Sequence, residues 1–218
     1  KTIIIADNLV NDYCGLEARY TQKNVNIGLQ EIERIFGANL QNEVGPLPIF
    51  LKEESKNKNT HILFCRDYYQ SDNPQHQEYL IKSGEHCLHD TSGVEFPKSI
   101  KDLAKDDNLI NCSGLVIPIA NMNSYLQKVA NLDLLDASLP EREEKVRFLL
   151  VGFHTERRVF NTANMLRNLF GFQVAVFSHF LASSNREFHF NALRYQFPDN
   201  RIPVFNHIKE LEAFLGTD

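Results

Sequence analysis

The sequence lacks an apolar run long enough to cross a membrane, and it does not begin with a signal-peptide pattern. It also lacks internal repeats and linker-like stretches. The cysteines have no CxxC spacing, and Cys65 falls within a predicted buried strand; they are Cys14, Cys65, Cys87 and Cys112. These absences argue against a membrane protein, a repeat protein or a disulfide framework. We therefore expect free thiols in a reducing compartment, with the cytoplasm as the location.

A strong charge imbalance is also absent. The chain has 23 Lys and Arg against 28 Asp and Glu, a formal net charge of −5. This mild acidity argues against a nucleic-acid partner. The hydrophobic fraction of 43%, with 16 Phe, is enough to fill a sizeable core, and we predict a single domain over residues 1–218.

The most informative stretch is 147–183, which reads as strand, tight turn, helix and strand. The apolar runs Phe148–Val151 and Phe172–Phe177 are the two strands, and helical spacing of apolar residues lies between Gly152 and Gly171. Both strands are apolar on both faces, which is typical of parallel strands covered by helices. Open α/β sheets bind ligands at the carboxyl edge of their strands, so 152–158 is the first place to look for chemistry.

Further apolar runs predict a three-layer α/β/α fold, with a parallel six-stranded sheet and helices on both faces. The expected strands are 2–6, 60–65, 108–111, 146–151, 172–177 and 201–205. The expected helices are 24–37, 124–135, a segment from a Ser184 cap to about Tyr195, and a closing helix with Ile208, Leu211 and Leu215. Residues 38–59 hold Gly45, Pro46, Pro48 and a charged run, which predict a loop or short hairpin arm. The apolar segment 114–122 is expected to form a lid or an interface.

Two motifs carry a family resemblance. Residues 152–163, G-F-H-T-E-R-R-V-F-N-T-A, resemble the signature G-x-x-T-x-x-C-V-x-x-T-A of the isochorismatase-like, or cysteine hydrolase, superfamily. The position of the nucleophilic cysteine holds Arg158. Residues 84–96 resemble a second family loop, W-P-x-H-C-x-x-G-T-x-G-A-E, with matches at His86, Cys87, Thr91, Gly93 and Glu95. The resemblance implies a flavodoxin-like fold and a dimer.

The resemblance also locates the family's catalytic base, an Asp in a D-x-Q-N-D-F segment. Aligning Asn11, Asp12 and Tyr13 with N-D-F puts Asn8 at the base position and Asp7 one residue early. Either the base is lost to Asn8, or a one-residue bulge brings Asp7 into its place.

The family's catalytic Lys stands at the end of the third strand, where this chain has Cys112, or Ser113 if the register slips by one. In the family a Cys thiolate attacks an amide or related carbon, the Lys lowers the thiol pKa, and the Asp carries the proton. Isochorismate-cleaving members lack the Cys but need the Asp and the Lys. Arg158 stays protonated and cannot be a nucleophile.

A metal is not expected. Residues 66–69, R-D-Y-Y, resemble the family's R-D-W-H, whose Asp and His bind a metal in the nicotinamidase branch. Asp67 is present, but Tyr69 replaces the His, and a zinc-type site needs three or four donors. Asp67 and His86 are only weak metal candidates, and we expect no cofactor.

The resemblance implies a cis peptide between Phe153 and His154 that shapes an oxyanion-type pocket. It makes Phe153, His154, Thr155 and Tyr69 the candidate ligand-binding residues. Arg158 is expected to point into the cleft and pair with Asp7, Asp67 or a bound anion. The alternative is that Arg158 and Arg157 both turn to solvent.

Three functional hypotheses follow. The first is a catalytically impaired member that binds a small anionic ligand or a protein partner in the inherited cleft. The second is an active hydrolase of an amide, nicotinamide-like or isochorismate-like substrate, with Cys112 as nucleophile, Arg158 lowering its pKa and Asp7 as base. The third is a structural subunit whose cleft is filled by Arg158 and Phe153.

Overall fold

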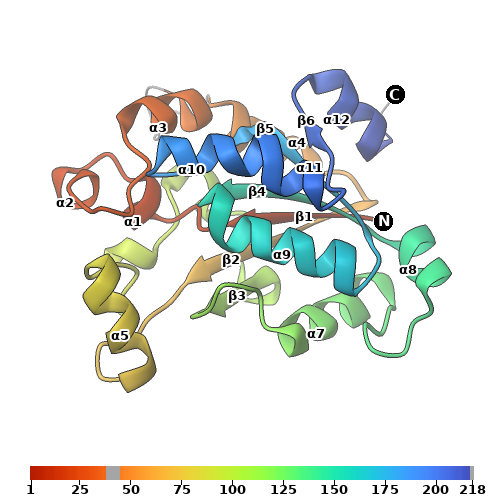
Figure 1. Ribbon diagram of the computed structural model, residues 1–218, viewed down its shortest axis with the longest axis horizontal. Helices are drawn as coiled ribbons and strands as arrows, with labels where there is room; N and C mark the ends of the chain where they lie inside the picture. Colours follow the sequence, from red (N-terminus) through yellow and green to blue (C-terminus); the bar gives the residue numbers. More distant parts are fainter. Residues whose placement is uncertain (38–44, 217–218) are drawn as a thin grey trace.

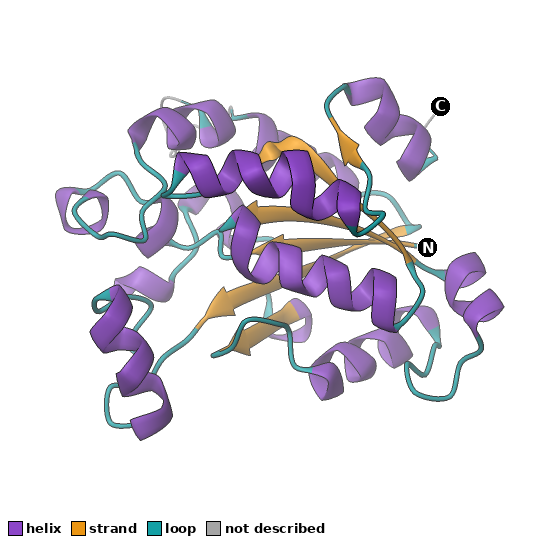
Figure 2. Ribbon diagram, viewed as in Figure 1, coloured by secondary structure: helices purple, strands orange, loops and turns teal. Residues whose placement is uncertain are grey.

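A single parallel sheet forms the centre of the computed structural model, which describes residues 1–37 and 45–216. The strand order is β3-β2-β1-β4-β5-β6, and each neighbouring pair is parallel. The strands are β1 Thr2–Asp7, β2 Thr60–Asp67, β3 Leu109–Cys112, β4 Arg147–Phe153, β5 Gln173–Ala182 and β6 Val204–Phe205. The predicted six-stranded parallel α/β architecture is confirmed (Figures 1 and 2).

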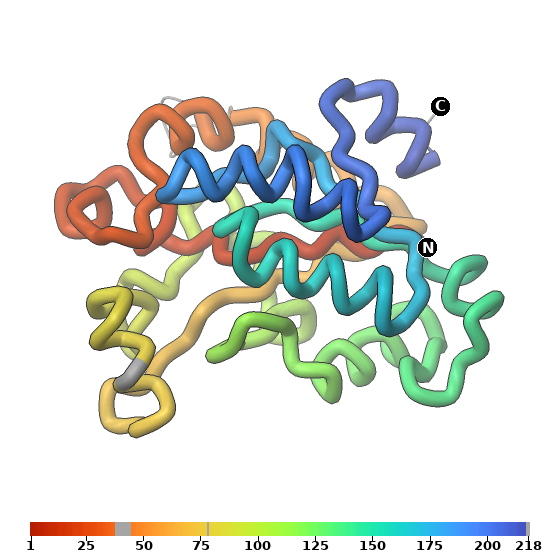
Figure 3. Tube along the Cα trace, in the orientation of Figure 1, coloured from red at the N-terminus to blue at the C-terminus, as the bar shows by residue number. Residues whose placement is uncertain are grey.

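Helices cover both faces of the sheet (Figure 2). They are α1 Asn11–Cys14, α2 Ala18–Thr21, α3 Leu29–Phe36, α4 Pro46–Glu54, α5 Pro74–Ser83, α6 Lys98–Lys101, α7 Ile119–Ala130, α8 Leu139–Lys145, α9 Phe160–Asn164, α10 Arg186–Asn191, α11 Phe197–Asp199 and α12 Ile208–Leu215. Turns of π-helix extend α9 at both ends, over Thr155–Val159 and Met165–Leu169, and another joins α10 to α11 over Ala192–Gln196. The helical segments 155–169 and 186–199 run side by side across one face (Figure 3).

Alternation along β1 divides the core into two clusters, because successive side chains of a strand point to opposite faces. Ile4 and Ala6 join the cluster that contains α3, α4 and α12. Ile3 and Ile5 join the cluster that contains α7 and α9. All six residues of β1 are buried, as the apolar run at the start of the sequence predicted.

Several predicted boundaries were wrong. The helix predicted over 24–37 begins only at Leu29, because Gly28 has a positive φ of 87° and interrupts the pattern. The predicted strand at 201–205 contributes only Val204 and Phe205 to the sheet. The helix predicted from Ser124 begins at Ile119, directly after Pro118. The segment 114–122, predicted as a lid or an interface, is therefore partly helical.

The segment 38–59 was predicted as a loop or hairpin arm, and this was wrong for 46–54, which form α4. Residues 38–44 lie outside the described residues. The two prolines lie in the first turn of α4, where a missing N–H breaks no intrahelical bond.

The predicted cap at Ser184 was also wrong. The side chain of Asn185 caps α10 by accepting a hydrogen bond from the backbone N–H of Phe188. Among the described residues, none of the helices has the length and apolar character that a membrane crossing requires.

Candidate functional site

The carboxyl ends of β1, β2 and β4 meet at one edge of the sheet, where Asp7, Asp67 and Phe153 are the last strand residues. Asp7 is in register with Gly152 of β4. A Cβ on Gly152 would lie 1.9 Å from the carbonyl oxygen of Asp7, and Gly152 has a φ of 120°. Glycine at 152 therefore allows the two strand ends to approach closely.

Arg158, in the helical turn that follows β4, reaches back over this edge and is 3% exposed. Its Nε and Nη2 donate to Oδ1 of Asp7 at 2.8 and 2.6 Å, and its Nη1 donates to Oδ1 of Asp67. The prediction that Arg158 points inward and pairs with an acid is confirmed, and it pairs with both acids. The alternative, that Arg158 turns to solvent, was wrong.

Asn8 and Tyr13 complete the bonding of Asp67. Asn8 accepts hydrogen bonds from Nη2 of Arg158 at 2.7 Å and from the backbone N–H of Asp67 at 2.7 Å. Its Nδ2 donates to Oδ2 of Asp67 at 3.1 Å, and the hydroxyl of Tyr13 donates to the same oxygen. We call Asp7, Asn8, Asp67 and Arg158 the Arg158 cluster.

β1 has no bulge that would move Asp7 into the place of Asn8. Asp7 continues the regular register of β1 with both neighbouring strands, and Asn8 turns the chain with a φ of 55°. Both side chains contact Arg158. The structure therefore places both candidates for the base position against the guanidinium.

Burial and the attraction between opposite charges shift the pKa values of the cluster in opposite directions. Burial raises the pKa of Asp7 to about 6, an effect that the charge of Arg158 offsets only in part. Burial lowers the pKa of Arg158, but the nearby carboxylates of Asp67 and Asp7 raise it by more. The pKa of Arg158 is therefore well above its usual value. Oδ2 of Asp7 is buried and has no hydrogen-bond partner within residues 1–37 and 45–216. Arg158 is therefore a permanent buried cation held by two acids.

A small cavity of about 90 Å³ lies beside the cluster, and we call it the edge pocket. Its lining consists of Asn8, Tyr13, Asp67, Tyr69, Tyr79, Ser113, Gly114, Leu115, His154, Arg157 and Arg158. Arg157 is half-exposed, with Nη1 donating to the hydroxyl of Tyr79 at 3.0 Å. Three of the eleven lining residues are tyrosines, and Asp67, Arg157 and Arg158 bring charged side chains to the same wall.

Of the four residues predicted to bind a ligand, Tyr69 and His154 line the edge pocket, whereas Phe153 and Thr155 do not. Phe153 is fully buried against Phe36, with ring centroids 6.2 Å apart. The Thr155 hydroxyl donates to the carbonyl of Ala182 at 3.0 Å and also contacts His189. Side chains alternate around the end of β4, so neighbours in sequence point to different places.

His154 follows Phe153 across a cis peptide bond, as predicted. Its Nδ1 accepts a hydrogen bond from the backbone N–H of Ser184 at 3.0 Å. Burial, followed by the charge of Arg157, lowers the pKa of His154 to about 3. His154 is therefore neutral near pH 7.

Cys112 lies at the end of β3, as predicted, but it does not line the edge pocket. It is 1% exposed and belongs to the same buried cluster as Ile117 and Met122. The next residue, Ser113, does line the pocket.

The two weak metal candidates have different surroundings. Asp67 is bonded to Arg158, Asn8 and Tyr13. Nδ1 of His86 lies 2.7 Å from the carbonyl oxygen of Gly84, and burial lowers the pKa of His86. Within the part of the chain that the structure describes, no group of three or more His, Cys, Asp or Glu side chains could hold a metal ion.

Sequence reasoning missed two residues of this site. Tyr13 was used only to align the N-D-Y segment, although its hydroxyl bonds to Asp67. Tyr79 comes from α5 and carries no motif that could have identified it.

Comparisons with known proteins place the fold. No protein-family model and no curated protein matches the sequence. Among solved structures, a nicotinamidase/pyrazinamidase from Bacillus subtilis has a TM-score of 0.63 and 20% identity, over 94% of this chain and 100% of that chain. An isochorismatase family protein from Desulfovibrio vulgaris has a TM-score of 0.66 and 12% identity, over 99% and 98%. An N-carbamoylsarcosine amidase from Thermoplasma acidophilum has a TM-score of 0.57 and 14% identity, over 94% and 95%. The likeness covers nearly the whole chain, which therefore has the fold of the isochorismatase-like hydrolases.

Proposed function

We propose that this protein is a non-catalytic relative of the isochorismatase-like hydrolases and that it acts by binding a protein partner. The observation that carries the proposal is the Arg158 cluster. A guanidinium stands at the position where the resemblance places a nucleophilic cysteine, and it is bonded to both Asp7 and Asp67.

The chemistry of the cluster supports this proposal. A guanidinium remains protonated in proteins, so Arg158 has no lone pair with which to attack a carbon. Asp7, one of the two candidates for the general base, uses Oδ1 to hold Arg158 and does not line the edge pocket. A general base must come within hydrogen-bond reach of the proton it removes.

The alternative hydrolase would need Cys112 as the nucleophile. Its thiol is buried in the core cluster and does not line the edge pocket, so a substrate in that pocket would not meet it. The family's lysine has no counterpart at Cys112 or Ser113. The Cys112 thiol donates to the backbone carbonyl oxygen of Ile110, at a sulfur–oxygen distance of 3.8 Å.

The edge pocket favours a protein partner over a small anionic ligand. Its volume of about 90 Å³ compares with roughly 300 to 1,000 Å³ for typical ligand pockets. Each nitrogen of Arg158 already donates to a protein oxygen, so few of its N–H groups are left to bind an anion. The half-exposed Arg157 is the other cation that lines the pocket.

The test is release of ammonia from nicotinamide and from N-carbamoylsarcosine, the substrates named for two structural neighbours. An active nicotinamidase serves as the positive control. We expect the wild type and the Cys112→Ser variant to give the same background as heat-denatured protein. Release by the wild type that disappears in the Cys112→Ser variant would support the rearranged hydrolase and end this proposal.

A further inference from the structure

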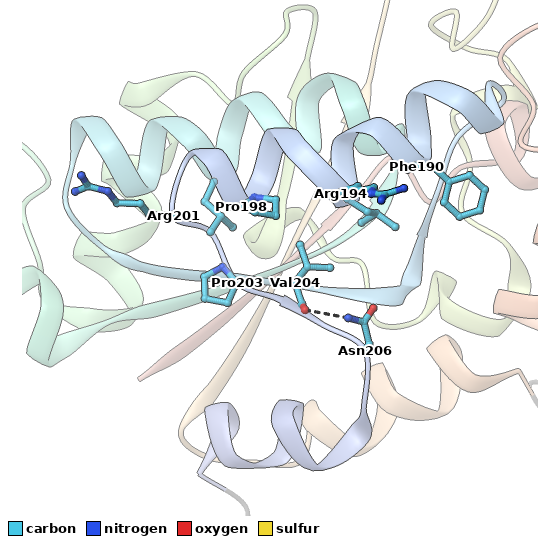
Figure 4. Close-up of a pocket in the computed structure, with 9 residues that line it drawn as sticks. Phe190, Arg194, Pro198, Arg201, Pro203, Val204 and Asn206 are labelled. Carbon is cyan, nitrogen blue, oxygen red and sulfur yellow. Dashed lines mark hydrogen bonds between the residues drawn. The ribbon is translucent and has the colours of Figure 1, made fainter.

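A long groove shares no lining residue with the edge pocket. Figure 4 shows its first hollow, between the helical segment 186–199 and β6. The groove consists of two hollows of about 780 and 660 Å³ that share Phe190, Leu193 and Asn206. The first hollow lies along α10, α11 and β6, and the second continues towards α3 and the end of β5. We call the two hollows together the arginine groove.

Basic side chains are concentrated in the groove, although the chain has a formal net charge of −5. Four arginines line it, namely Arg34, Arg186, Arg194 and Arg201, whereas Glu31 is the single acidic residue among its described lining. The other acids of this helical segment, Glu187 and Asp199, do not line it.

Three of these arginines lack acidic partners among the described residues. Arg34 pairs with Glu31 at 2.9 Å, so that pair is neutral overall. The guanidinium of Arg186 lies 5.5 Å from the ring of Phe190, and that of Arg194 lies 5.5 Å from the ring of Tyr195. Arg201 is exposed and has no side-chain partner within residues 1–37 and 45–216. The groove therefore keeps about three uncompensated positive charges.

Apolar side chains lie between these charges. Leu193, Ile202, Pro203 and Val204 line the first hollow, and Phe190 is 51% exposed where the two hollows meet. Figure 4 shows Arg201 towards one end of this hollow and Arg194 and Phe190 towards the other. Acidic side chains could reach the arginines while apolar ones cover the residues between them.

We propose that the arginine groove binds an acidic, amphipathic segment of a partner protein, an assignment that rests on the proposed function as a binding protein. Charge complementarity selects the acidic side chains, and the apolar lining selects the hydrophobic ones. Arginine suits this role because its planar fork can bind a carboxylate through two hydrogen bonds.

The lining favours a peptide over a single-stranded nucleic acid. Proteins that bind single strands present aromatic rings on which successive bases stack. Among the described lining residues, Phe190 is the only Phe, Tyr or Trp, and Arg186 already lies against its ring. Aliphatic side chains make up most of the remaining apolar lining.

The test uses the full chain and a fluorescein-labelled ten-residue peptide of alternating Glu and Leu, with fluorescence anisotropy as the readout. We expect saturable binding that weakens with added salt. The Arg194→Glu/Arg201→Glu variant should bind at least about tenfold more weakly, which corresponds to about 1.4 kcal/mol. The matched control is Lys58→Glu/Lys98→Glu, which makes the same charge change at exposed positions outside the groove. It should bind within about twofold of the wild type.

Results of three kinds would overturn the assignment. One is absence of binding, or equal loss in both double variants. Another is preferential binding of a ten-residue oligothymidylate, which would point to nucleic acid. The third is self-association by light scattering that the Arg194→Glu/Arg201→Glu change abolishes, which would make a second copy the occupant. None of these results alters the ammonia-release test, so failure of the groove assignment is distinguishable from failure of the proposed function.

Discussion

Arg158 links three parts of the chain because its side chain, in the turn after β4, donates to residues at the ends of β1 and β2. A buried ion cluster of this kind is costly to desolvate, and its stability depends on each charge having its partner. Arg158 is such a charge, since it is buried and is bonded to both Asp7 and Asp67. It makes the acids of the edge part of a structural ion pair.

Replacing Arg158 by Leu should destabilise the protein by roughly 3 to 5 kcal/mol, because two buried carboxylates would lose their counter-ion. Urea unfolding at pH 7 measures the change. A control Arg19→Leu variant, at an exposed position, should stay within about 0.5 kcal/mol of the wild type. The triple variant Arg158→Leu/Asp7→Asn/Asp67→Asn should recover part of the loss. Equal stability of wild type and Arg158→Leu would contradict the role of the cluster.

His154 should make the protein sensitive to acid. Its pKa is 6.5 in the unfolded reference and about 3 in the folded protein. Between these values the unfolded chain binds a proton that the folded chain does not, so the free energy of unfolding falls as the pH is lowered from about 6.5 towards 3. Urea midpoints at a series of pH values should show a flatter dependence for His154→Gln than for the wild type. Parallel curves for the two proteins would show that His154 does not cause this loss.

The sequence predicted which charged residues would meet, but it missed Tyr13 and Tyr79. Asp7, Asp67 and Arg158 could be brought together because each closes or follows an apolar run, and parallel strand ends share an edge. The directions of Phe153 and Thr155 could not be predicted, because they depend on local backbone geometry after the strand. A motif gives positions along the chain and leaves side-chain direction open.

The β1–β4 contact at the site depends on one residue without a side chain. Gly152→Ala should destabilise the protein by about 3 kcal/mol or more, because the new Cβ would lie 1.9 Å from the carbonyl oxygen of Asp7. Thermal and urea unfolding measure the effect. Gly114→Ala is the matched control, because a Cβ built there has no heavy atom of the described residues within 4 Å, apart from those of its chain neighbours. Similar stability of the two variants would show that β4 can shift away from β1 at low cost.

Elements were predicted well where apolar residues alone decide the structure, and poorly where turns decide it. β1 is buried along its whole length, so its apolar run was sufficient. The helix α4 was missed because Pro46 and Pro48 were read as helix breakers, although they lie in its first turn. The edge strand β6 is short, and Pro203, next to it, cannot donate to a sheet.

The single sheet has a separate hydrophobic core on each of its two faces. Ile4 packs into the cluster on one face, and its neighbour Ile5 packs into the cluster on the other. Both residues lie on β1, which is bonded to β2 on one side and β4 on the other. Loss of either core would leave an apolar face of the same strands exposed to water, which couples the stability of the two layers.

This coupling predicts that the chain unfolds as a single cooperative unit, which is also the behaviour expected from the predicted single domain over 1–218. Ile4→Ala and Ile5→Ala should each lower the free energy of unfolding by about 2 to 5 kcal/mol, since each leaves a cavity in a different core. Circular dichroism at 222 nm reports the helices. The near-ultraviolet signal reports the seven tyrosines in a chain that has no tryptophan. The two signals should give the same urea midpoint in the wild type and shift together in both variants. Two separate transitions, with each variant moving only one of them, would show that the layers fold independently.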